Sequence, residues 1–250
     1  MWSKLCRRIY FNTKNRAIIG FRRHNLFKRA FDIIFAVLFL LVFSPIYIVT
    51  AIIIKITSPG PIIYKAKRVG KDGKLFICYK FRSMCVESGE VHITTLKDDK
   101  RVYAFGKFIR ATKIDELPQM VNILLGQMSV VGPRPEDETN ADSIYVGEYK
   151  KLLSARPGLT SPGSIYDFTH GELIESEEKY ISDFLPEKLE LELYYVEKST
   201  FFYDIRIVLR TAAAIFCKVF GITCAAPAEY EKIVERISAK KMLVQTAGKK

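Results

Sequence analysis

The stretch AFDIIFAVLFLLVFSPIYIVTAIII, from Ala30 to Ile54, decides how this chain folds. Asp32 is its only charged residue, and the stretch is longer than the roughly 20 apolar residues that span a bilayer. It is too long for the apolar part of a secretory signal peptide, and no small-residue cleavage site precedes a polar mature start. We therefore expect this segment to lie in a membrane.

Both flanks of this segment are basic, which is informative about its topology. Residues 1–31 contain many lysines and arginines and no acid. Basic residues also follow the segment, namely Lys55, Lys65, Lys67, Arg68 and Lys71. Because basic flanks stay in the cytoplasm, a straight spanning helix would have to export one of them. A helix that enters and leaves by the same face satisfies both, so we favour a re-entrant, broken helix. Its alternative is a transmembrane helix with a tolerated kink.

Ser44 and Pro45, near the middle of the segment, mark the predicted break. Proline has no N–H to donate and clashes with the carbonyl four residues back, while the Ser44 hydroxyl can bond a freed backbone group. Asp32 is spaced along the helix to pair with Lys28 and Arg29. We expect these three residues to anchor the helix at the level of the lipid headgroups.

The formal net charge of +12 and the pI of about 9.4 indicate an anionic partner: nucleic acid, an acidic membrane surface or a phosphorylated substrate. No nucleic-acid-binding motif is present, and a basic arm directly before the lipid segment favours an anionic phospholipid membrane. The five cysteines form no C-x-x-C pair and lie at no zinc-like spacing from a histidine. Reduced thiols in a cytosolic compartment are therefore expected.

After the membrane segment, the pattern predicts a small β-hairpin followed by helices. Strand-like stretches at 62–65 and 75–81 flank a Lys-Asp-Gly turn. Helical spacing of apolar residues covers 102–110, 115–125, 187–197 and 201–220. The last of these is either an interfacial helix or a surface helix packed on a soluble core, and its pattern fits both equally well.

The sharpest cluster of chemical groups is RATKIDELPQ at 110–119, followed by GPRP at 132–135. Adjacent helical residues point about 100° apart, so Asp115 and Glu116 can share a site only near the start of a helix. Pro118 supports this placement, because proline is tolerated in a first turn, and Asp115 is then a candidate N-cap. The simpler interpretation is that Asp115 only caps the helix and Glu116 is a solvated acid.

A phosphate brought to this helix start would meet free backbone N–H groups, with Arg110 and Arg134 as bidentate partners. Carboxylate oxygens beside phosphate are also the setting in which Mg²⁺ binds, so we expect Mg²⁺ at Asp115 and Glu116. The sequence contains no nucleophile-elbow serine or cysteine and no P-loop motif, so it does not support triad or P-loop chemistry.

A series of further short motifs extends from about Lys28 to Thr211. They are Lys28-Arg29 with Phe31-Asp32, Ser44-Pro45, Ser58-Pro59-Gly60-Pro61, Arg68-Val69-Gly70, Lys80-Phe81-Arg82-Ser83-Met84, Asp98-Asp99 with Arg101, Asp115-Glu116-Leu117-Pro118-Gln119, Asn122, Gly126, Met128-Ser129 and Gly132-Pro133-Arg134-Pro135. Each motif alone is weak, but their order and spacing together are highly specific. The chain resembles the small form of the bacterial sugar transferases called monotopic polyprenyl-phosphate phosphoglycosyl transferases.

The resemblance implies a two-step reaction in which the aspartate matching Asp115 attacks the diphosphate of a UDP-sugar donor and releases UMP. The enzyme then holds the phospho-sugar as an acyl phosphate, and polyprenyl (undecaprenyl) phosphate accepts it. Asp115 is thus expected to be the nucleophile and a Mg²⁺ ligand, and Glu116 to assist the lipid phosphate's attack or to support the metal. This step would begin surface-glycan assembly at the cytoplasmic face of the bacterial inner membrane.

The family places the arginine matching Arg110 and the Pro-Arg-Pro turn of Arg134 at the phosphate site. From the other matching motifs we add Arg68, Lys80 and Arg82 to the predicted phosphate-binding set. Many members continue after R-P-G with a glutamine and an arginine, in a loop where we expect donor contacts. Both are absent from residues 159–167 here, so the sugar is left open, as is whether the chain forms a homodimer.

We therefore expect an α+β fold: a mainly helical cytosolic catalytic domain with a small β-hairpin, anchored by a broken re-entrant membrane helix and interfacial amphipathic helices. The expected divisions are a basic N-terminal arm (1–27), the re-entrant helix (28–56), the catalytic domain with an interfacial helix near 201–220 (57–225), and a charged tail (226–250). A non-catalytic basic membrane adaptor and a nucleic-acid-binding membrane protein are the alternative functions, although we expect no nucleic-acid partner.

Overall fold

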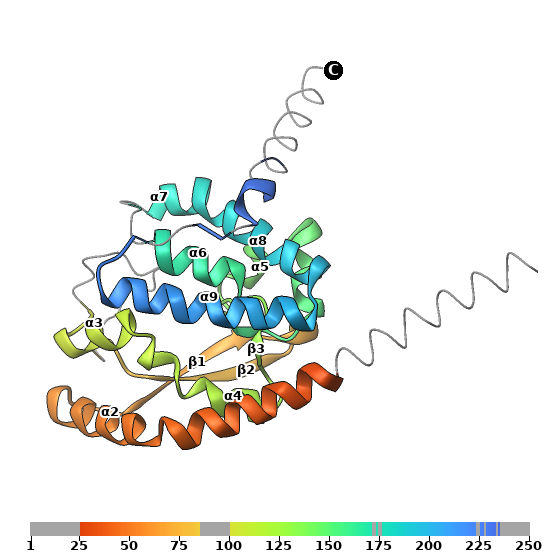
Figure 1. Ribbon diagram of the computed structural model, residues 1–250. Helices are drawn as coiled ribbons and strands as arrows, with labels where there is room; N and C mark the ends of the chain where they lie inside the picture. The colour runs from red at the N-terminus through yellow and green to blue at the C-terminus, as the bar shows by residue number, and fades with distance from the viewer. Residues whose placement is uncertain are drawn as a thin grey trace, which may run out of the picture.

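The computed structural model describes residues 26–85, 101–171, 174, 177–223, 226–227, 229–233 and 235. Most of the predicted N-terminal arm, the polar stretch 86–100 and most of the predicted tail lie outside the described residues. From bottom to top in Figure 1, a bent helix lies beneath a β-hairpin, and a group of helices covers the other side of the hairpin. The fold is mainly helical with small sheets, as predicted.

The helices begin with Leu26–Val42 and continue with α2 (Ser44–Thr57), α3 (Ala104–Ala111), α4 (Gln119–Leu124), α5 (Ala141–Ile144), α6 (Pro162–His170), α7 (Glu177–Lys179), α8 (Leu185–Lys198) and α9 (Phe201–Val219). The strands are β1 (Ile63–Val69), β2 (Leu75–Phe81), β3 (Ser129–Val131) and β4 (Gly158–Thr160). Short 3₁₀ or π-helical turns occupy Lys71–Gly73, Ile114–Glu116, Gly147–Ser154 and Tyr180–Phe184. The helices predicted at 187–197 and 201–220 are confirmed as α8 and α9.

The apolar segment forms two helices that are bent by 62° where they meet. Pro45 cannot donate to the carbonyl of Leu41, and the Ser44 hydroxyl donates to that carbonyl instead, at 2.8 Å. Among the described residues, no single helix is long and apolar enough to cross a membrane, whereas these two helices together reach that length and composition. The bend therefore lies where the sequence places Ser44 and Pro45.

The first helix is fixed to the rest of the chain by Asp32, which is only 1% exposed. Its Oδ1 accepts hydrogen bonds from the Ser129 hydroxyl at 3.0 Å and from the Val130 N–H at 2.9 Å, both on β3. Lys28 and Arg29, which helical spacing predicted to pair with Asp32, act on its carboxylate through their charge but form their own hydrogen bonds with other groups. The hydrogen bonds to the carboxylate come from β3.

Lys28 and Arg29 join the same helix to two other elements. The Lys28 ammonium forms an ion pair with Asp204 on α9. The Arg29 guanidinium donates to the carbonyl oxygens of Ile123 and Leu124, at 2.6 and 2.9 Å. These carbonyls lie at the C-terminal end of α4, where a cation is favourable for the helix dipole. The first helix is thus fixed to β3, α4 and α9 through buried or half-buried polar contacts.

The predicted β-hairpin is present, with β1 and β2 antiparallel and Ile63 opposite Phe81. Its first strand extends beyond the predicted end at residue 65 to Val69, because Ala66 and Val69 are buried while Lys65 and Lys67 are exposed. Asn122 of α4 ties β2 to the following chain, since its amide bonds the Ile77 carbonyl at 2.6 Å and the Tyr79 N–H at 3.0 Å.

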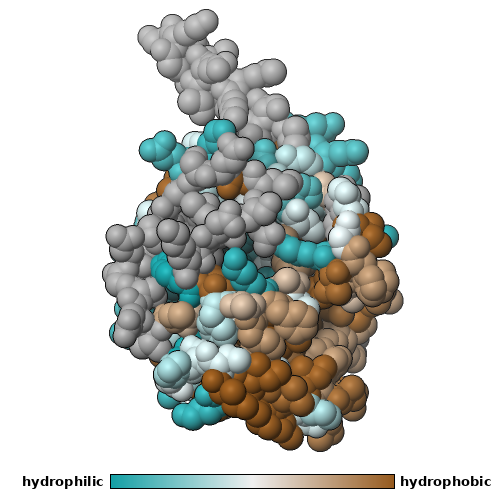
Figure 2. All heavy atoms as spheres, turned by 90° about the vertical axis from the view of Figure 1, so that its left-hand side faces the viewer, coloured by the Kyte–Doolittle hydropathy of each residue, from teal (hydrophilic) through white to brown (hydrophobic). Residues whose placement is uncertain are grey.

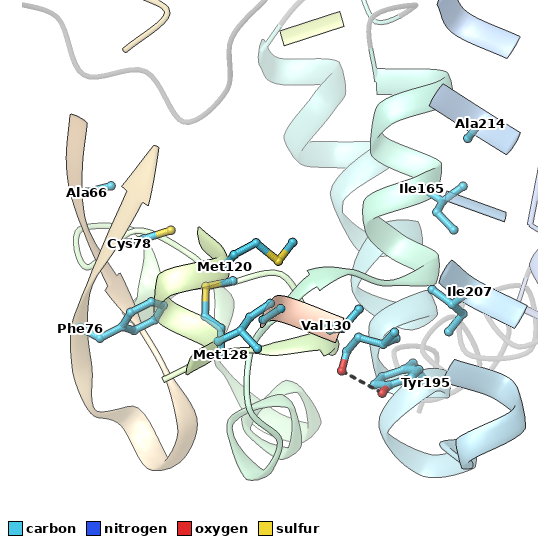
Figure 3. Close-up of a cluster of buried hydrophobic side chains, with 13 residues drawn as sticks. Ala66, Phe76, Cys78, Met120, Met128, Val130, Ile165, Tyr195, Ile207 and Ala214 are labelled. Carbon is cyan, nitrogen blue, oxygen red and sulfur yellow. Dashed lines mark hydrogen bonds between the residues drawn. The ribbon is translucent and has the colours of Figure 1, made fainter. Parts of the chain in front are cut away.

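Strands β3 and β4 form a short parallel pair that the sequence analysis did not predict. The backbones of Gly132 and Gly158 approach each other closely. A Cβ added to Gly158 would lie 2.1 Å from the nitrogen of Gly132. Figure 3 shows the core around it: Met120, Met128 and Val130 lie between the hairpin residues and the residues of α6 and α9. The Tyr195 hydroxyl donates to the Val131 carbonyl at 3.1 Å. The core thus fixes the chain immediately before Pro133-Arg134.

Glu192 of α8 is a buried carboxyl group, 2% exposed, that joins two loops. Its Oε1 accepts from the Ser161 hydroxyl at 2.6 Å and from the Arg134 N–H at 3.2 Å. A Cβ added to Gly163 would lie 2.8 Å from the Glu192 carboxyl carbon, so the start of α6 packs directly on this group. Burial raises the pKa of Glu192 to about 7, despite these hydrogen bonds.

Replacing Asp32 by Ala should lower the free energy of unfolding by about 2–3 kcal/mol, because the Ser129 hydroxyl and Val130 N–H lose a charged acceptor. The midpoint of thermal unfolding in detergent measures this. Asp32→Asn keeps an acceptor oxygen and should lose less, and Asp142→Ala, at an exposed position, should lose almost nothing. Equal midpoints for Asp32→Ala and Asp142→Ala would contradict the proposed docking of the helix.

Glu192→Gln should change how stability depends on pH. With its pKa raised to about 7, Glu192 keeps its proton in the folded protein while an unfolded chain loses it near pH 4.5, so stability falls as pH rises between these values. Gln keeps the acceptor oxygen and cannot ionise. The variant should match the wild type at pH 5 and exceed its free energy of unfolding by about 3 kcal/mol at pH 8. Unfolding curves at both pH values, with Glu178→Gln as an exposed control, test this, and parallel behaviour of both variants would refute it.

Candidate active site

Asp115 and Glu116 lie in the 3₁₀ turn Ile114–Glu116, which connects α3 to α4. Lys113, just before the turn, has a left-handed backbone with φ of 59°, and this reverses the chain after α3. The predicted N-cap role of Asp115 is wrong, because Pro118 precedes α4 and no side chain caps that helix. The N–H groups of Glu116 and Leu117 already bond carbonyls within the turn, so they are not free for a phosphate.

Glu116 is the point at which three cations meet. Its Oε1 lies 3.2 Å from the Lys80 ammonium, 3.2 Å from the Arg134 guanidinium and 3.7 Å from the Lys113 ammonium. Burial alone would raise the pKa of Glu116, but Lys113, Lys80 and Arg134 together hold it well below its usual range. Glu116 is therefore an ionised carboxylate that holds these side chains in place.

Asp115 has the opposite electrostatic environment, although it is equally buried at 6% exposed. Burial and the neighbouring charge of Glu116 raise its pKa, and Lys80, Lys113 and Arg110 offset this only in part. Its Oδ1 is buried and has no hydrogen-bond partner among the described residues. A buried oxygen with unused lone pairs and raised basicity is suited to attack an electrophile or to bind a cation.

Two carboxylates without further acidic ligands fit Mg²⁺ better than a transition metal. Within the described part of the chain, no three His, Cys, Asp or Glu side chains are grouped to hold a metal ion. Mg²⁺ commonly binds one or two carboxylates and takes its other ligands from water and substrate phosphates. The unpartnered Oδ1 of Asp115 beside Glu116 is consistent with that arrangement.

The structure brings part of the predicted phosphate-binding set to this acid pair. Lys80 on β2 and Arg134 in the Pro-Arg-Pro loop contact Glu116 directly, and Arg110 at the end of α3 is close enough to affect Asp115. The Arg134 N–H donates to Glu192, and its guanidinium contacts Glu116. Both the backbone and the end of the Arg134 side chain are therefore fixed. Long-range contacts, which spacing along the chain could not reveal, assemble this cationic site.

Two other arginines of the predicted set form contacts outside the acid pair, and their role in phosphate binding stays a prediction. Arg82 is buried, and its guanidinium donates to the carbonyl oxygens of Ser58 and Pro59. Arg68 forms an ion pair with Asp137 at 2.8 Å and donates to the Pro135 carbonyl at 3.4 Å. Both arginines stabilise loops around the site. The guanidinium nitrogens that form these bonds face the named carbonyl and carboxylate groups, not Asp115 or Glu116.

Two contacts to the acidic turn were missed by the sequence analysis. The Tyr47 hydroxyl of α2 donates to the Leu117 carbonyl at 2.5 Å, so the bent helix contacts the residue after Glu116. The Phe168 ring of α6 lies 4.8 Å from the Lys113 ammonium. Phe168 directly follows residues 159–167, where the sequence departs from the family pattern and where a loop was expected. The structure places most of these residues in β4 and α6, so only the departure itself could have pointed to Phe168.

Comparisons with known proteins identify the family to which this sequence is similar. The family model described as bacterial sugar transferase matches residues 23–218. A UDP-N-acetylgalactosamine-undecaprenyl-phosphate N-acetylgalactosaminephosphotransferase from Aeromonas hydrophila is 38% identical over 191 residues, covering 75% of this chain and 43% of that protein. A UDP-glucose:undecaprenyl-phosphate glucose-1-phosphate transferase from Escherichia coli (strain K12) is 36% identical over 192 residues, covering 75% and 40%.

A third relative matches along nearly its whole length. The exopolysaccharide production protein PSS of Rhizobium leguminosarum bv. phaseoli is 36% identical over 198 residues, covering 75% of this chain and 94% of that protein. The chain thus spans about two fifths of the first two relatives and nearly all of the third. The resemblance drawn from the motifs is confirmed, and the chain belongs to the bacterial sugar transferase family.

Proposed function

We propose that this protein transfers a phospho-sugar from a UDP-sugar to polyprenyl phosphate, releasing UMP and forming a polyprenyl-diphosphate-sugar. The observation that carries the proposal is the unequal acid pair: Asp115 has a buried, unpartnered oxygen, and Glu116 beside it is surrounded by cations. Relatives named as UDP-sugar:undecaprenyl-phosphate transferases support the same reaction class.

In the first step, an Asp115 oxygen attacks the phosphorus that carries the sugar. The bond from that phosphorus to the oxygen bridging the two phosphates breaks, and UMP leaves with the electron pair. Asp115 then carries the phospho-sugar as an acyl phosphate. The raised pKa of Asp115 supports this role, since a more basic carboxylate is the better nucleophile once it is ionised.

In the second step, an oxygen of polyprenyl phosphate attacks the same phosphorus, and the Asp115 carboxylate leaves with the electron pair. Both steps bring anions together, so positioned cations should supply most of the stabilisation. Glu116 holds Lys80 and Arg134 in place, and cations positioned in advance can stabilise the charge that develops on the phosphate. Glu116 therefore acts in this proposal by positioning cations.

Mg²⁺ would be held by Asp115 and Glu116 and would neutralise phosphate charge during the reaction. The residues fit this ion, because Asp115 Oδ1 lacks a hydrogen-bond partner among the described groups and lies in the same turn as Glu116. The same two residues are proposed to bind Mg²⁺ and to carry the reaction, as the sequence predicted.

We further propose that the bent helix enters the cytoplasmic face of the inner membrane and returns to it. Large apolar side chains cover its outer surface, including Ile34, Leu38, Leu41, Val42, Ile48 and Ile52, all more than half exposed. Figure 2 shows hydrophobic surface along the lower part of one face, continuing up its right-hand side. Such a continuous apolar surface suits contact with lipid, and Lys28, Arg29 and Asp32 at its edge are fixed to the protein.

Asp115→Asn should reduce UMP release from a UDP-sugar by about three orders of magnitude or more, because the amide cannot act as the nucleophile. The assay supplies polyprenyl phosphate and Mg²⁺ and compares a panel of UDP-sugars. Asp142→Asn, at an exposed position away from the site, should retain wild-type turnover. Full turnover by Asp115→Asn would show that Asp115 is not the nucleophile. If the wild type released no UMP with any UDP-sugar, the result would favour a non-catalytic adaptor.

Single cysteines at Phe27 and Lys71, in a background whose five native cysteines are serine, test the topology. Both positions are exposed; Phe27 lies in the first turn of the bent helix, and Lys71 lies beyond its C-terminal end. In the re-entrant arrangement, a membrane-impermeant thiol reagent should label both sites only after the inner membrane is opened. Labelling of one site in intact spheroplasts would show that the helices span the bilayer.

A further inference from the structure

Tyr47 of α2 connects the second half of the bent helix to the turn that carries the acid pair. The tyrosine is half-buried, and its hydroxyl donates to the Leu117 carbonyl at 2.5 Å. Its ring packs edge-on against the Phe81 ring of β2, with the two ring centres 5.7 Å apart. Because packing restrains the ring, the hydroxyl is held in the direction of the carbonyl that it binds.

Leu117 can pass this contact on to the acid pair. Its N–H donates to the Ile114 carbonyl at 3.2 Å and closes the 3₁₀ turn Ile114–Glu116. Its carbonyl accepts from the Tyr47 hydroxyl and also from the Met120 N–H, at 2.5 and 3.0 Å. The N–H of Leu117 thus belongs to the acidic turn, while its carbonyl is held by α2 and by the start of α4.

Asp115 depends on this backbone for its position more than Glu116 does. Three cations hold the Glu116 carboxylate, whereas the buried Oδ1 of Asp115 has no hydrogen-bond partner among the described residues. The backbone of the turn must therefore set much of the position of that oxygen. Attack on phosphorus requires accurate alignment, and a misplacement of about 1 Å can lower the rate about 100-fold.

The helix α2, which lies beneath α3 and the hairpin in Figure 1, has two different faces. One carries Tyr47, Ala51 and Ile54, spaced at i, i+4 and i+7, and it packs in one apolar cluster with Ile114 and Leu117. The other carries large apolar side chains that are more than half exposed. Apolar packing has little directional preference, so the hydroxyl of Tyr47 adds the directed contact that packing lacks.

We propose that Tyr47 is a positioning residue for the transfer reaction: its hydrogen bond to Leu117 fixes the turn from which Asp115 attacks the donor phosphate. This inference rests on the proposed function and adds a residue of the bent helix to it. Tyr47 acts through the backbone of Leu117 and not by contact with a substrate. If Tyr47 only docked α2, its loss would lower stability and leave the turnover of the folded protein unchanged.

The test compares Tyr47→Phe with the wild type, as full-length proteins in detergent with Mg²⁺, a UDP-sugar and polyprenyl phosphate. Phenylalanine keeps the ring against Phe81 and removes only the hydroxyl, so the variant should fold. We expect kcat to fall about tenfold with both KM values unchanged, because the nucleophile shifts while the substrate-binding groups stay in place. Single-turnover UMP release without polyprenyl phosphate should slow by the same factor, since it reports the attack by Asp115 alone.

Tyr149→Phe is the matched control. It also removes the hydroxyl of a half-buried tyrosine, but that hydroxyl donates to Glu190 on α8 at 3.0 Å, and Tyr149 packs in a separate apolar cluster. The control should lower the midpoint of thermal unfolding at least as much and keep the wild-type kcat. Hydrogen exchange without substrate should be faster in the peptide spanning 114–124 of Tyr47→Phe than in the wild type or the control.

Three results would overturn the inference: an unchanged kcat in Tyr47→Phe, an equal fall of kcat in Tyr149→Phe, or a higher KM in place of a lower kcat. Unchanged hydrogen exchange of the 114–124 peptide would also overturn it. The three kinetic results all require UMP release by the wild type, so they leave the proposed function intact. If the wild type released no UMP, the proposed function itself would fail.

Discussion

The buried hydrogen bonds between Asp32 and β3 are the contact on which the rest of the structure depends. They fix the first helix against the strand that leads into Gly132-Pro133-Arg134. Arg29 extends this attachment to the C-terminal end of α4, and Tyr47, beyond the bend, contacts the turn before α4. The two halves of the bent helix therefore hold α4, which closely follows Asp115 and Glu116, near both of its ends. A change in how the bent helix lies would be transmitted to the acid pair.

The acid pair shows how similar side chains acquire different chemistry. Both carboxylates are buried to the same extent, but the cations meet at Glu116 and leave an oxygen of Asp115 without a partner. Burial raises the pKa of Asp115, and three cations lower that of Glu116. The pair thus combines a reactive carboxylate with one that holds the surrounding charges. The proposed two-step transfer requires this division, because its nucleophile must act among anions.

Local sequence patterns predicted most of the elements, and they failed where distant contacts decide the structure. Strand-like stretches on either side of a Lys-Asp-Gly turn predicted the hairpin, and helical spacing predicted α8 and α9. Strands β3 and β4 are three residues each, too short for a pattern, and they depend on the close approach of Gly132 and Gly158.

The same limit applies to the site. The spacing of Asp32 pointed to Lys28 and Arg29, whereas its hydrogen-bond partners lie almost a hundred residues away. The motif around Asp115 was recognisable, but the turn at Lys113 and the contact of Phe168 with Lys218 exist only in the folded chain.

The most direct test of the central claim is to look for the covalent intermediate. The purified protein is incubated with a UDP-sugar and Mg²⁺ but without polyprenyl phosphate, then quenched and analysed by peptide mass spectrometry. The account predicts that a phospho-sugar is attached to Asp115 and is lost when polyprenyl phosphate is added before the quench. UMP release with the adduct on another residue, or with no adduct at all, would contradict it.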